Sequence, residues 1–385
     1  MDGMIKIEKI IPGGQGLGTN EDGKKLFFWN ALPGEIVDEY IITKKKSHYS
    51  EAIATKINHI SKYRVNPKDD CFLSTSPWQI MDYDYELELK QELVVEIFRE
   101  HHINIETPEI FTDFKDYYYR NKMEYSLYWD NEENKIELAF HSRGTHRKTP
   151  IKTSSLERPE IFQFAKKVVA DLNNRHEEAR KYQSLLLRCN QLGEVSGGLY
   201  ENHQPHPVFK NLSDKILNKT YSYSPNGFFQ VNLPVYEMAL KEIKKHLKTE
   251  KILDLYAGVG TIGLSVASDR DLTLVEVDKF AFNELKKNCE GLAKPFLSKS
   301  EEALKFISPD ETVILDPPRA GCDKKLIEKI LEKTPERIIY LSCNPATQAR
   351  DIKLLLEKYE INHIKIYNFF PHTPHIENLV ILERD

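Results

Sequence analysis

The stretch "KILDLYAGVGTIGLSVA", residues 251–267, decides the fold of the carboxyl-terminal part of the chain. It reads as a short apolar strand, a loop with glycines in the spacing G-x-G-x-x-G, and an apolar helix. Short apolar strands such as "LTLVEV", "ETVILD" and "RIIYLS" then alternate with helical segments. Strands that alternate with helices predict a mainly parallel, doubly wound α/β sheet with helices on both faces.

Ligands of such sheets bind beyond the carboxyl ends of the strands, and acidic residues occur at these positions here. Asp254 ends the first strand, and Glu276 ends the second, eighteen residues after Gly258. A carboxylate at the position of Glu276 can accept both ribose hydroxyls of an adenosine-bearing cofactor. These residues predict a nucleoside cofactor, and they leave nicotinamide dinucleotides and S-adenosylmethionine in competition.

The fourth strand ends in "VILDPPRAGCD", residues 313–323, where two prolines follow Asp316. Proline fixes φ and has no N–H group, so the turn is rigid and leaves its carbonyl groups free. This Asp-Pro-Pro turn resembles the corner with which class I S-adenosylmethionine-dependent methyltransferases face a planar base or amine. A dehydrogenase has no comparable need, so the turn favours S-adenosylmethionine, although two prolines can also simply end a strand.

A cysteine follows the fifth strand in "IIYLSCNPATQARD", residues 338–351, directly before a helix. A thiolate is a strong nucleophile, and the amino end of the helix should stabilise the charge on Cys343. A nucleophile next to a methyl donor predicts covalent activation of an unreactive carbon such as C5 of uracil, by addition of sulfur to C6. Glu377, at the start of the last strand, is the candidate base for the C5 proton, and His372 and His375 are weaker candidates.

Length and hydropathy patterning predict more than one domain upstream of this sheet. The first 58 residues alternate short β-rich runs with glycine turns, which is typical of a small antiparallel barrel. Residues 82–102 have apolar side chains at helical spacing. We therefore predict a barrel (1–58), a central α+β domain (59–84 and 108–224) and a domain that contains the α/β sheet (85–107 and 225–385).

Five motifs together resemble the RNA 5-methyluridine methyltransferase family and follow that family's order: "PNGFFQVN", "DLYAGVGTIGL", "ILDPPRAG", "LSCNPATQARD" and "FPHTPHIEN". The resemblance covers nearly the whole chain, since the barrel resembles a TRAM domain, an OB-like RNA-binding module, and "YYRNKMEYSL" resembles the start of the family's central domain. It implies a class I Rossmann-like methyltransferase domain, joined to this barrel and to a central RNA-binding domain.

The resemblance also implies roles for individual residues, with Cys343 as the nucleophile and Glu377 as the base. The residues that would contact S-adenosylmethionine are Gln230, Tyr256, Gly258, Thr261, Glu276 and Asp316. The residues that would contact RNA are Phe228, Arg120, Lys122 and Arg319, with Phe228 stacking on a flipped-out uracil. The implied substrate is a uridine in 23S ribosomal RNA, with a T-loop uridine of transfer RNA as the alternative. A non-catalytic RNA-binding protein with a vestigial methyltransferase fold is the alternative from another class.

The 54 basic and 59 acidic residues give a net charge of −5, but the basic ones are unevenly distributed. Residues 141–190 contain eleven lysines and arginines against five acids, and with Lys44 to Lys46 they are expected to contact RNA phosphates. No apolar run is long enough to span a membrane, which predicts a cytoplasmic protein, and we expect a monomer.

Many members of the family that carry the barrel hold an iron–sulfur cluster on four cysteines. Here Cys71 stands alone at the corresponding position, and "HRKTPIKTSSLE" has no cysteine, so neither a cluster nor another metal is expected.

Overall fold

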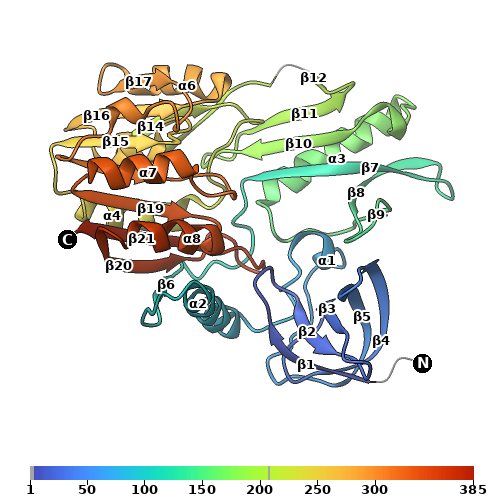
Figure 1. The fold of residues 1–385 in the computed structure, drawn as a ribbon. Helices are drawn as coiled ribbons and strands as arrows, with labels where there is room; N and C mark the ends of the chain where they lie inside the picture. The colour runs from blue at the N-terminus through green and yellow to red at the C-terminus, as the bar shows by residue number, and fades with distance from the viewer. Residues whose placement is uncertain (1–3, 207–208) are drawn as a thin grey trace.

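The computed structural model describes residues 4–206 and 209–385, and its first unit is a closed five-stranded barrel near the amino terminus (Figure 1). Its strands are β1 (Ile5–Ile10), β2 (Gly16–Thr19), β3 (Lys25–Trp29), β4 (Ile36–Lys45) and β5 (Tyr49–His59), in the order β1-β2-β3-β5-β4. Alternate residues such as Ile5 and Ile7 are buried, because successive side chains of a strand point to opposite faces. The predicted barrel is confirmed, but it is not wholly antiparallel as expected, since β3 and β5 pair in parallel.

Two helices connect the barrel to the rest of the chain, α1 (Phe72–Thr75) and α2 (Tyr83–Glu100). The side chain of Asp82 caps α2 by accepting hydrogen bonds from the backbone N–H groups of Asp84 and Tyr85. Leu89, Leu93 and other apolar residues of α2 are buried against the carboxyl-terminal unit. The predicted amphipathic helix over 82–102 is confirmed.

The central sheet has six antiparallel strands in the order β12-β11-β10-β7-β8-β9. The strands are β7 (Lys122–Asp130), β8 (Lys135–His141), β9 (Lys148–Pro150), β10 (Ser184–Cys189), β11 (Val195–Glu201) and β12 (Gln204–His206). Helix α3 (Pro159–Asn174) covers this sheet with Ile161, Ala165, Val169 and Leu172, which recur at helical spacing, and η1 (Ala179–Lys181) follows it.

The large sheet has eight strands in the order β17-β16-β15-β18-β19-β21-β20-β6. Its strands are β6 (Glu109–Phe111), β15 (Lys251–Leu255), β16 (Asp271–Glu276), β17 (Lys294–Leu297), β18 (Glu311–Leu315), β19 (Arg337–Ser342), β20 (Tyr359–Tyr367) and β21 (Glu377–Arg384). Strands β15 to β19 are parallel to one another, whereas β21 is antiparallel to β19 and β20. The order reverses at β15, so the carboxyl ends of β15 and β18 border a topological switch point.

Helices cover both faces of the large sheet, as the alternation predicted (Figure 1). On β15, Ile252 packs into one core with α4 (Leu233–Lys245), α5 (Thr261–Val266) and α6 (Lys279–Cys289). Leu253 packs into the other core with α2, α7 (Lys324–Lys333) and α8 (Pro345–Leu355), and η2 (Leu304–Phe306) adjoins this core. The predicted mixed α/β class is therefore confirmed.

Two short segments within residues 108–224 lie with the large sheet and not with the central one. β6 extends its edge by pairing with β20, and the hairpin of β13 (Leu212–Ile216) and β14 (Lys219–Tyr223) packs into the core around α4. Strands this short have no distinctive pattern, so only their tertiary partners place them.

Candidate active site

Strand pairing brings the predicted nucleophile and the predicted base to the same edge of the large sheet. Ser342 of β19 is paired with Asn378 of β21 in antiparallel register. In an antiparallel pair, the residue after Ser342 lies opposite the residue before Asn378. These residues are Cys343, which follows β19, and Glu377, which begins β21. Asp316 follows β18, the neighbour of β19, and therefore lies at this edge as well.

The thiol of Cys343 is partly buried, and its surroundings disfavour the thiolate. The pKa of Cys343 is raised to about 11, mainly by burial and then by the charges of Glu377 and Asp316, while Arg319 lowers it. Asn344 caps the following helix with its side chain. The helix end does not suffice to lower the pKa of Cys343 in this structure, because burial and two carboxyl groups outweigh its contribution.

The two carboxyl groups beside Cys343 are protonated more readily than ordinary acids. Burial raises the pKa of Glu377 well above its usual value, and so does Asp316, while the positive charge of Arg319 lowers it. Burial also raises the pKa of Asp316 to about 7. Glu377 is 3% exposed, so it is not a surface acid, and its burial beside Asp316 favours the protonated form of its carboxyl group.

The loop that carries Arg319 is fastened to the loop after Cys343. The backbone oxygen of Arg319 accepts hydrogen bonds from Nδ2 of Asn344 (2.8 Å) and Oγ1 of Thr347 (3.1 Å). The guanidinium of Arg319 donates from Nη2 to Nδ1 of His375 (3.1 Å). Burial lowers the pKa of His375 to about 4, so this imidazole is neutral. His372 lies within 3.0 Å of Oδ2 of Asp116, which gives it a structural partner.

The glycine loop leaves space at one position and packs tightly at another. A Cβ atom on Gly258 would meet nothing within 4 Å, whereas one on Gly260, at φ 89°, would approach Cδ1 of Leu285 to 2.6 Å. Gly258 donates its N–H to Oε2 of Glu276 (2.7 Å), and Oε1 of Glu276 accepts two further backbone N–H groups. The open space beside a fixed carboxylate fits the ribose of an adenosine-bearing cofactor.

Neighbouring residues hold this loop in shape. Oδ2 of Asp254 accepts a hydrogen bond from the N–H of Gly263 (2.8 Å), and burial raises the pKa of Asp254 to about 8. Tyr256 has a φ of 65°, which is strained for a residue other than glycine and is found at functional sites. Thr261 bonds through Oγ1 to the hydroxyl of Tyr236 (2.9 Å).

The segment before α4 presents one phenylalanine to solvent and buries the next. Phe228 is 71% exposed, whereas Phe229 is 3% exposed and stacks on Tyr223 at 3.8 Å between ring centroids. The interpretation that one of the two packs in the core is confirmed for Phe229.

Residues of the central domain fix this segment. Nζ of Lys122 donates to the backbone oxygens of Asn226 (3.1 Å) and Gly227 (3.2 Å), and burial lowers the pKa of Lys122 to about 8. Nδ2 of Asn121 donates to the backbone oxygen of Gln230 (3.0 Å). Arg120 is half-buried and donates from Nε to the backbone oxygen of Lys122 (2.9 Å). Sequence reasoning missed that Lys122 fastens the loop of Phe228, because backbone carbonyl partners leave no pattern in a sequence.

Several residues of the basic stretch 141–190 have partners within the protein. Arg188 is 1% exposed and lies over the rings of Tyr223 and Phe229, so its expected contact with phosphate is wrong. Arg175, Arg180 and Lys181 form ion pairs with acids of their own segment. The positive charge that this stretch offers to RNA is therefore smaller than its composition suggested.

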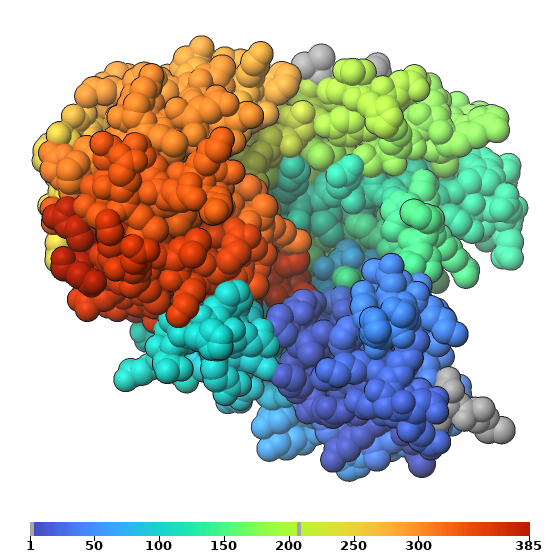
Figure 2. Space-filling model, in the orientation of Figure 1, coloured from blue at the N-terminus to red at the C-terminus, as the bar shows by residue number. Residues whose placement is uncertain are grey.

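The surface is hollowed where the orange and red large sheet, the green central domain and the blue barrel meet (Figure 2). A cavity of about 310 Å³ lies between the central domain and the start of α4, where Tyr118, Asn121, Arg158 and Asn232 line it. Cys343 and Glu377 do not line this cavity.

Four of the five cysteines are buried, and Cys343 is partly exposed. That the protein holds no iron–sulfur cluster stays a prediction. In the described ranges 4–206 and 209–385, no helix combines the length and the apolar character that crossing a membrane requires.

The sequence pattern of a family described as tRNA (Uracil-5-)-methyltransferase matches residues 303–385, which include Asp316, Cys343 and Glu377. Curated relatives named as uncharacterized RNA methyltransferases match over nearly their full length. One from Lactobacillus johnsonii is 28% identical and covers 94% of each chain, and one from Nanoarchaeum equitans is 29% identical over 99% of this chain and 93% of its own.

A solved structure has the same fold. It is the Pyrococcus abyssi tRNA (uracil-54, C5)-methyltransferase in complex with S-adenosyl-L-homocysteine, which is 23% identical, covers 99% of both chains and has a TM-score of 0.77. The matched pattern, the full-length relatives and the shared fold agree with the motifs at the sheet edge, and the chain is similar to the family described as tRNA (Uracil-5-)-methyltransferase.

Proposed function

We propose that the protein methylates C5 of a uridine in RNA, with S-adenosylmethionine as the methyl donor and through a covalent adduct between Cys343 and C6 of the uracil. The observation that carries this proposal is the register of β19 and β21, which sets Cys343 opposite Glu377 beside Asp316. A thiol and a carboxyl group opposite each other supply the nucleophile and the base that addition to C6 and removal of the C5 proton need.

The residues of the chain divide the reaction between them. Sγ of Cys343 forms a bond to C6, which makes C5 nucleophilic, and C5 then takes the methyl group that S-adenosylmethionine supplies when bound. Addition requires that Cys343 first lose its thiol proton to solvent. Glu377 then accepts the C5 proton, the electrons of that C–H bond re-form the double bond between C5 and C6, and Sγ leaves C6 as a thiolate, which takes up a proton again. Since Glu377 must be ionised to act as a base, the positive charge of Arg319 assists by lowering its pKa.

The residues that we propose to hold S-adenosylmethionine surround the space beside Gly258. They are Gln230, Tyr256, Gly258, Thr261, Glu276 and Asp316. Glu276 is supported by its position at the end of β16, where it is 8% exposed and adjoins the open side of Gly258. Its carboxylate can accept ribose hydroxyls in addition to backbone N–H groups, because an ionised carboxylate offers about four acceptor sites.

We propose that the barrel (1–58) and the central domain (59–84 and 108–224) bind the RNA, and that the domain of residues 85–107 and 225–385 performs the chemistry. Phe228 is exposed on a loop that Lys122 fixes, which suits stacking on a flipped-out base. Arg120 and Arg319 remain proposed RNA contacts, and the exposed guanidinium of Arg319 adjoins the active site.

The proposed substrate is 23S ribosomal RNA, and a second candidate is a T-loop uridine of transfer RNA. The second is favoured by the Pyrococcus abyssi protein, since an enzyme named for uridine 54 of transfer RNA has this fold over 99% of the chain. Mapping 5-methyluridine in both RNAs from cells that lack this protein distinguishes the two substrates.

The chemistry is tested with structured RNA that carries tritium at C5 of uridine. The wild-type protein should release tritium only when S-adenosylmethionine is present. Cys343→Ala should abolish the release, and Glu377→Gln should trap a covalent adduct that migrates slowly in a denaturing gel. Cys289→Ala, at a buried cysteine on α6, is the matched control and should retain activity.

No release from ribosomal or transfer RNA by folded wild-type protein would refute the proposed activity. RNA binding that survives Cys343→Ala without any methylation would favour a non-catalytic RNA-binding protein.

A further inference from the structure

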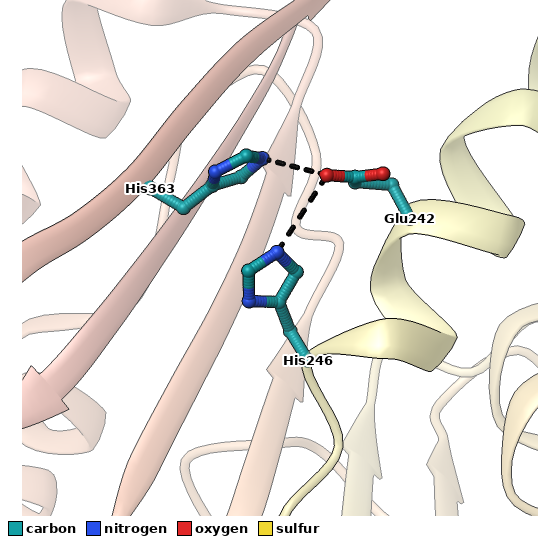
Figure 3. Close-up of side chains that lie close together, drawn as sticks. All are labelled: Glu242, His246 and His363. Atoms are coloured by element: carbon teal, nitrogen blue, oxygen red, sulfur yellow. Dashed lines mark ion pairs between the residues drawn. The ribbon is translucent and has the colours of Figure 1, made fainter.

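Three side chains that bind transition metals in proteins meet on the face of the large sheet that α4 covers (Figure 3). Glu242 belongs to the last turn of α4, His246 is the residue that directly follows α4 at its carboxyl end, and His363 belongs to β20. Oε1 of Glu242 lies 3.0 Å from Nε2 of His363 and 3.6 Å from Nε2 of His246. All three ligand atoms lie within 4.8 Å of one another.

Local geometry brings these side chains together. Glu242 and His246 are four residues apart, so they lie on one face of the helix. On β20, Ile361 pairs with Leu382 of β21, whereas His363 pairs with the next residue, Ile381, which makes Asn362 the extra residue of a β-bulge.

The bulge turns His363 toward α4. In a regular strand, residues two apart point to the same face, and Ile361 packs into the core on the α2 and α8 side. After the bulge, His363 and Lys365 contact Glu242 on the opposite side. The strand thus departs from regular pairing at Asn362, directly before His363, which completes the cluster.

We propose that Glu242, His246 and His363 form a binding site for one divalent transition-metal ion, with zinc as the best fit, that joins α4 to β20. Two imidazoles and a carboxylate are ligands of tetrahedral zinc, with distances of about 2.0 to 2.2 Å from the metal. Ligands at these distances are about 3.3 Å apart in a tetrahedron. The separations of 3.0 and 3.6 Å bracket that value.

Two further observations support the site. Nε2 of His363 is buried and has no hydrogen bond of acceptable geometry, although it lies close to the carboxylate. The backbone oxygen of His246 accepts a hydrogen bond from Nη1 of Arg337 (2.6 Å), which holds this residue in place at the end of α4.

A lysine competes with the metal for the same oxygen. Nζ of Lys365 lies 3.2 Å from Oε1 of Glu242, and a bound cation would displace it. Other partners are within reach, because Nζ lies 3.7 Å from Oε2 of Glu109 and 4.5 Å from the ring centroid of Phe111. Lys245 bonds to the other oxygen, Oε2 of Glu242, at 2.8 Å and can stay there.

The metal would act on stability and not on the methyl transfer. Glu242 lies ten positions after Asn232, the residue that precedes α4, which is about 15 Å along the helix at 1.5 Å per residue. The site joins the helix that follows the loop of Phe228 to the strand that leads toward Glu377, so it fixes elements on which the active site is built.

The test is a calorimetric titration of the full-length protein, freed of metal by a chelator and dialysed, with Zn²⁺ alone. We expect one ion per chain and a rise in melting temperature at saturating zinc. The double variant His246→Ala/His363→Ala should weaken binding at least a hundredfold and lose the rise in melting temperature. Lys365→Met should tighten binding at least tenfold, because it removes the competing ammonium group.

The matched control is the double variant His101→Ala/His102→Ala, which removes another histidine pair and should leave zinc binding unchanged. If the first double variant fails to fold, the single variant His363→Gln and the gain in Lys365→Met decide the question. Zinc that binds no more tightly to wild type than to the His246 and His363 variants, or a Lys365→Met variant that gains nothing, would overturn the proposal. None of these readouts depends on methylation.

Discussion

Alkylation of Cys343 should be slow, and replacing its neighbour Glu377 should accelerate it. The pKa of Cys343 is raised from 9.0 to about 11. At pH 8 the thiolate fraction is then about 0.1%, compared with about 10% for an ordinary thiol, since each pKa unit is a factor of ten. A more basic thiolate is also more nucleophilic, with a Brønsted slope of about 0.4 to 0.5 in log rate per pKa unit. The rise of two units in pKa therefore increases the reactivity of the thiolate itself roughly tenfold. The net expectation is a rate about tenfold below that of an ordinary thiol.

The assay follows the reaction with iodoacetamide by mass spectrometry between pH 7 and pH 10. The other four cysteines are buried, so alkylation of the folded protein reports Cys343, and Cys343→Ser is the blank. Glu377→Gln removes a charge that raises the pKa and should increase the rate severalfold, whereas Arg319→Met should decrease it. S-adenosylmethionine should accelerate the reaction, because its positive sulfonium stabilises the thiolate of Cys343. S-adenosylhomocysteine, which lacks that charge, is the control for a bound ligand that merely blocks access of iodoacetamide to the thiol.

A wild-type protein that reacts as fast as a free thiol would contradict this account of the site. Equal rates for Glu377→Gln and wild type across the pH range would show that the carboxyl group does not act on the sulfur.

Three other predictions concern different parts of the molecule. Burial raises the pKa of Asp254 from 3.8 to about 8, so the folded state binds a proton that the unfolded chain releases, and stability should fall as pH rises from about 4 to about 8. The loss of unfolding free energy reaches about 4 kcal/mol by pH 7, and Asp254→Asn should remove most of it. Urea unfolding at several pH values measures this, and an unchanged dependence of the unfolding free energy on pH in the variant would count against the prediction. Nζ of Lys90 lies 2.7 Å from the carboxylate of Glu86, so Glu86→Ala leaves a buried ammonium without its counter-charge. The variant should lose about 3 to 5 kcal/mol of unfolding free energy, whereas a loss below about 1 kcal/mol would show that the pair is not buried. Phe228→Leu should lower kcat/KM for RNA by about five- to 150-fold, from the roughly 1 to 3 kcal/mol of a lost stacking contact, without changing the melting temperature; an unchanged kcat/KM would remove Phe228 from the RNA site.

The motifs could be located from the sequence because each one combines a local signal with a topological rule. The apolar strand before the glycine loop, the rigid Asp-Pro-Pro turn and the strand that ends at Ser342 all carry their own patterns, and parallel strands bring their carboxyl ends to one edge. The antiparallel strand β21 is different, because Glu377 lies at its start. Only the pairing of Ser342 with Asn378 shows that this residue reaches the same edge.

Burial was the property that the sequence left open. Glu86 and Lys90 are four residues apart, a spacing that is typical of an exposed ion pair on a helix, yet both are 0% exposed. Lys90 donates hydrogen bonds to Asn368 and Phe370, which precede the last strand. Arg188 was counted among the phosphate contacts and lies in the core. A charged residue is buried when distant segments pack around it, and those segments are not adjacent in the chain.

The sequence by itself determined the alternation of strands and helices, the barrel, the glycine loop and the identity of the residues at the strand ends. Those features depend on neighbours within a few positions, which periodicity and turn chemistry report. Only the packing of distant segments raises the pKa values of Asp316 and Glu377 beside Cys343, and only the bulge directs His363 toward Glu242. Both depend on desolvation and on strand register, which arise only when segments far apart in the chain pack together.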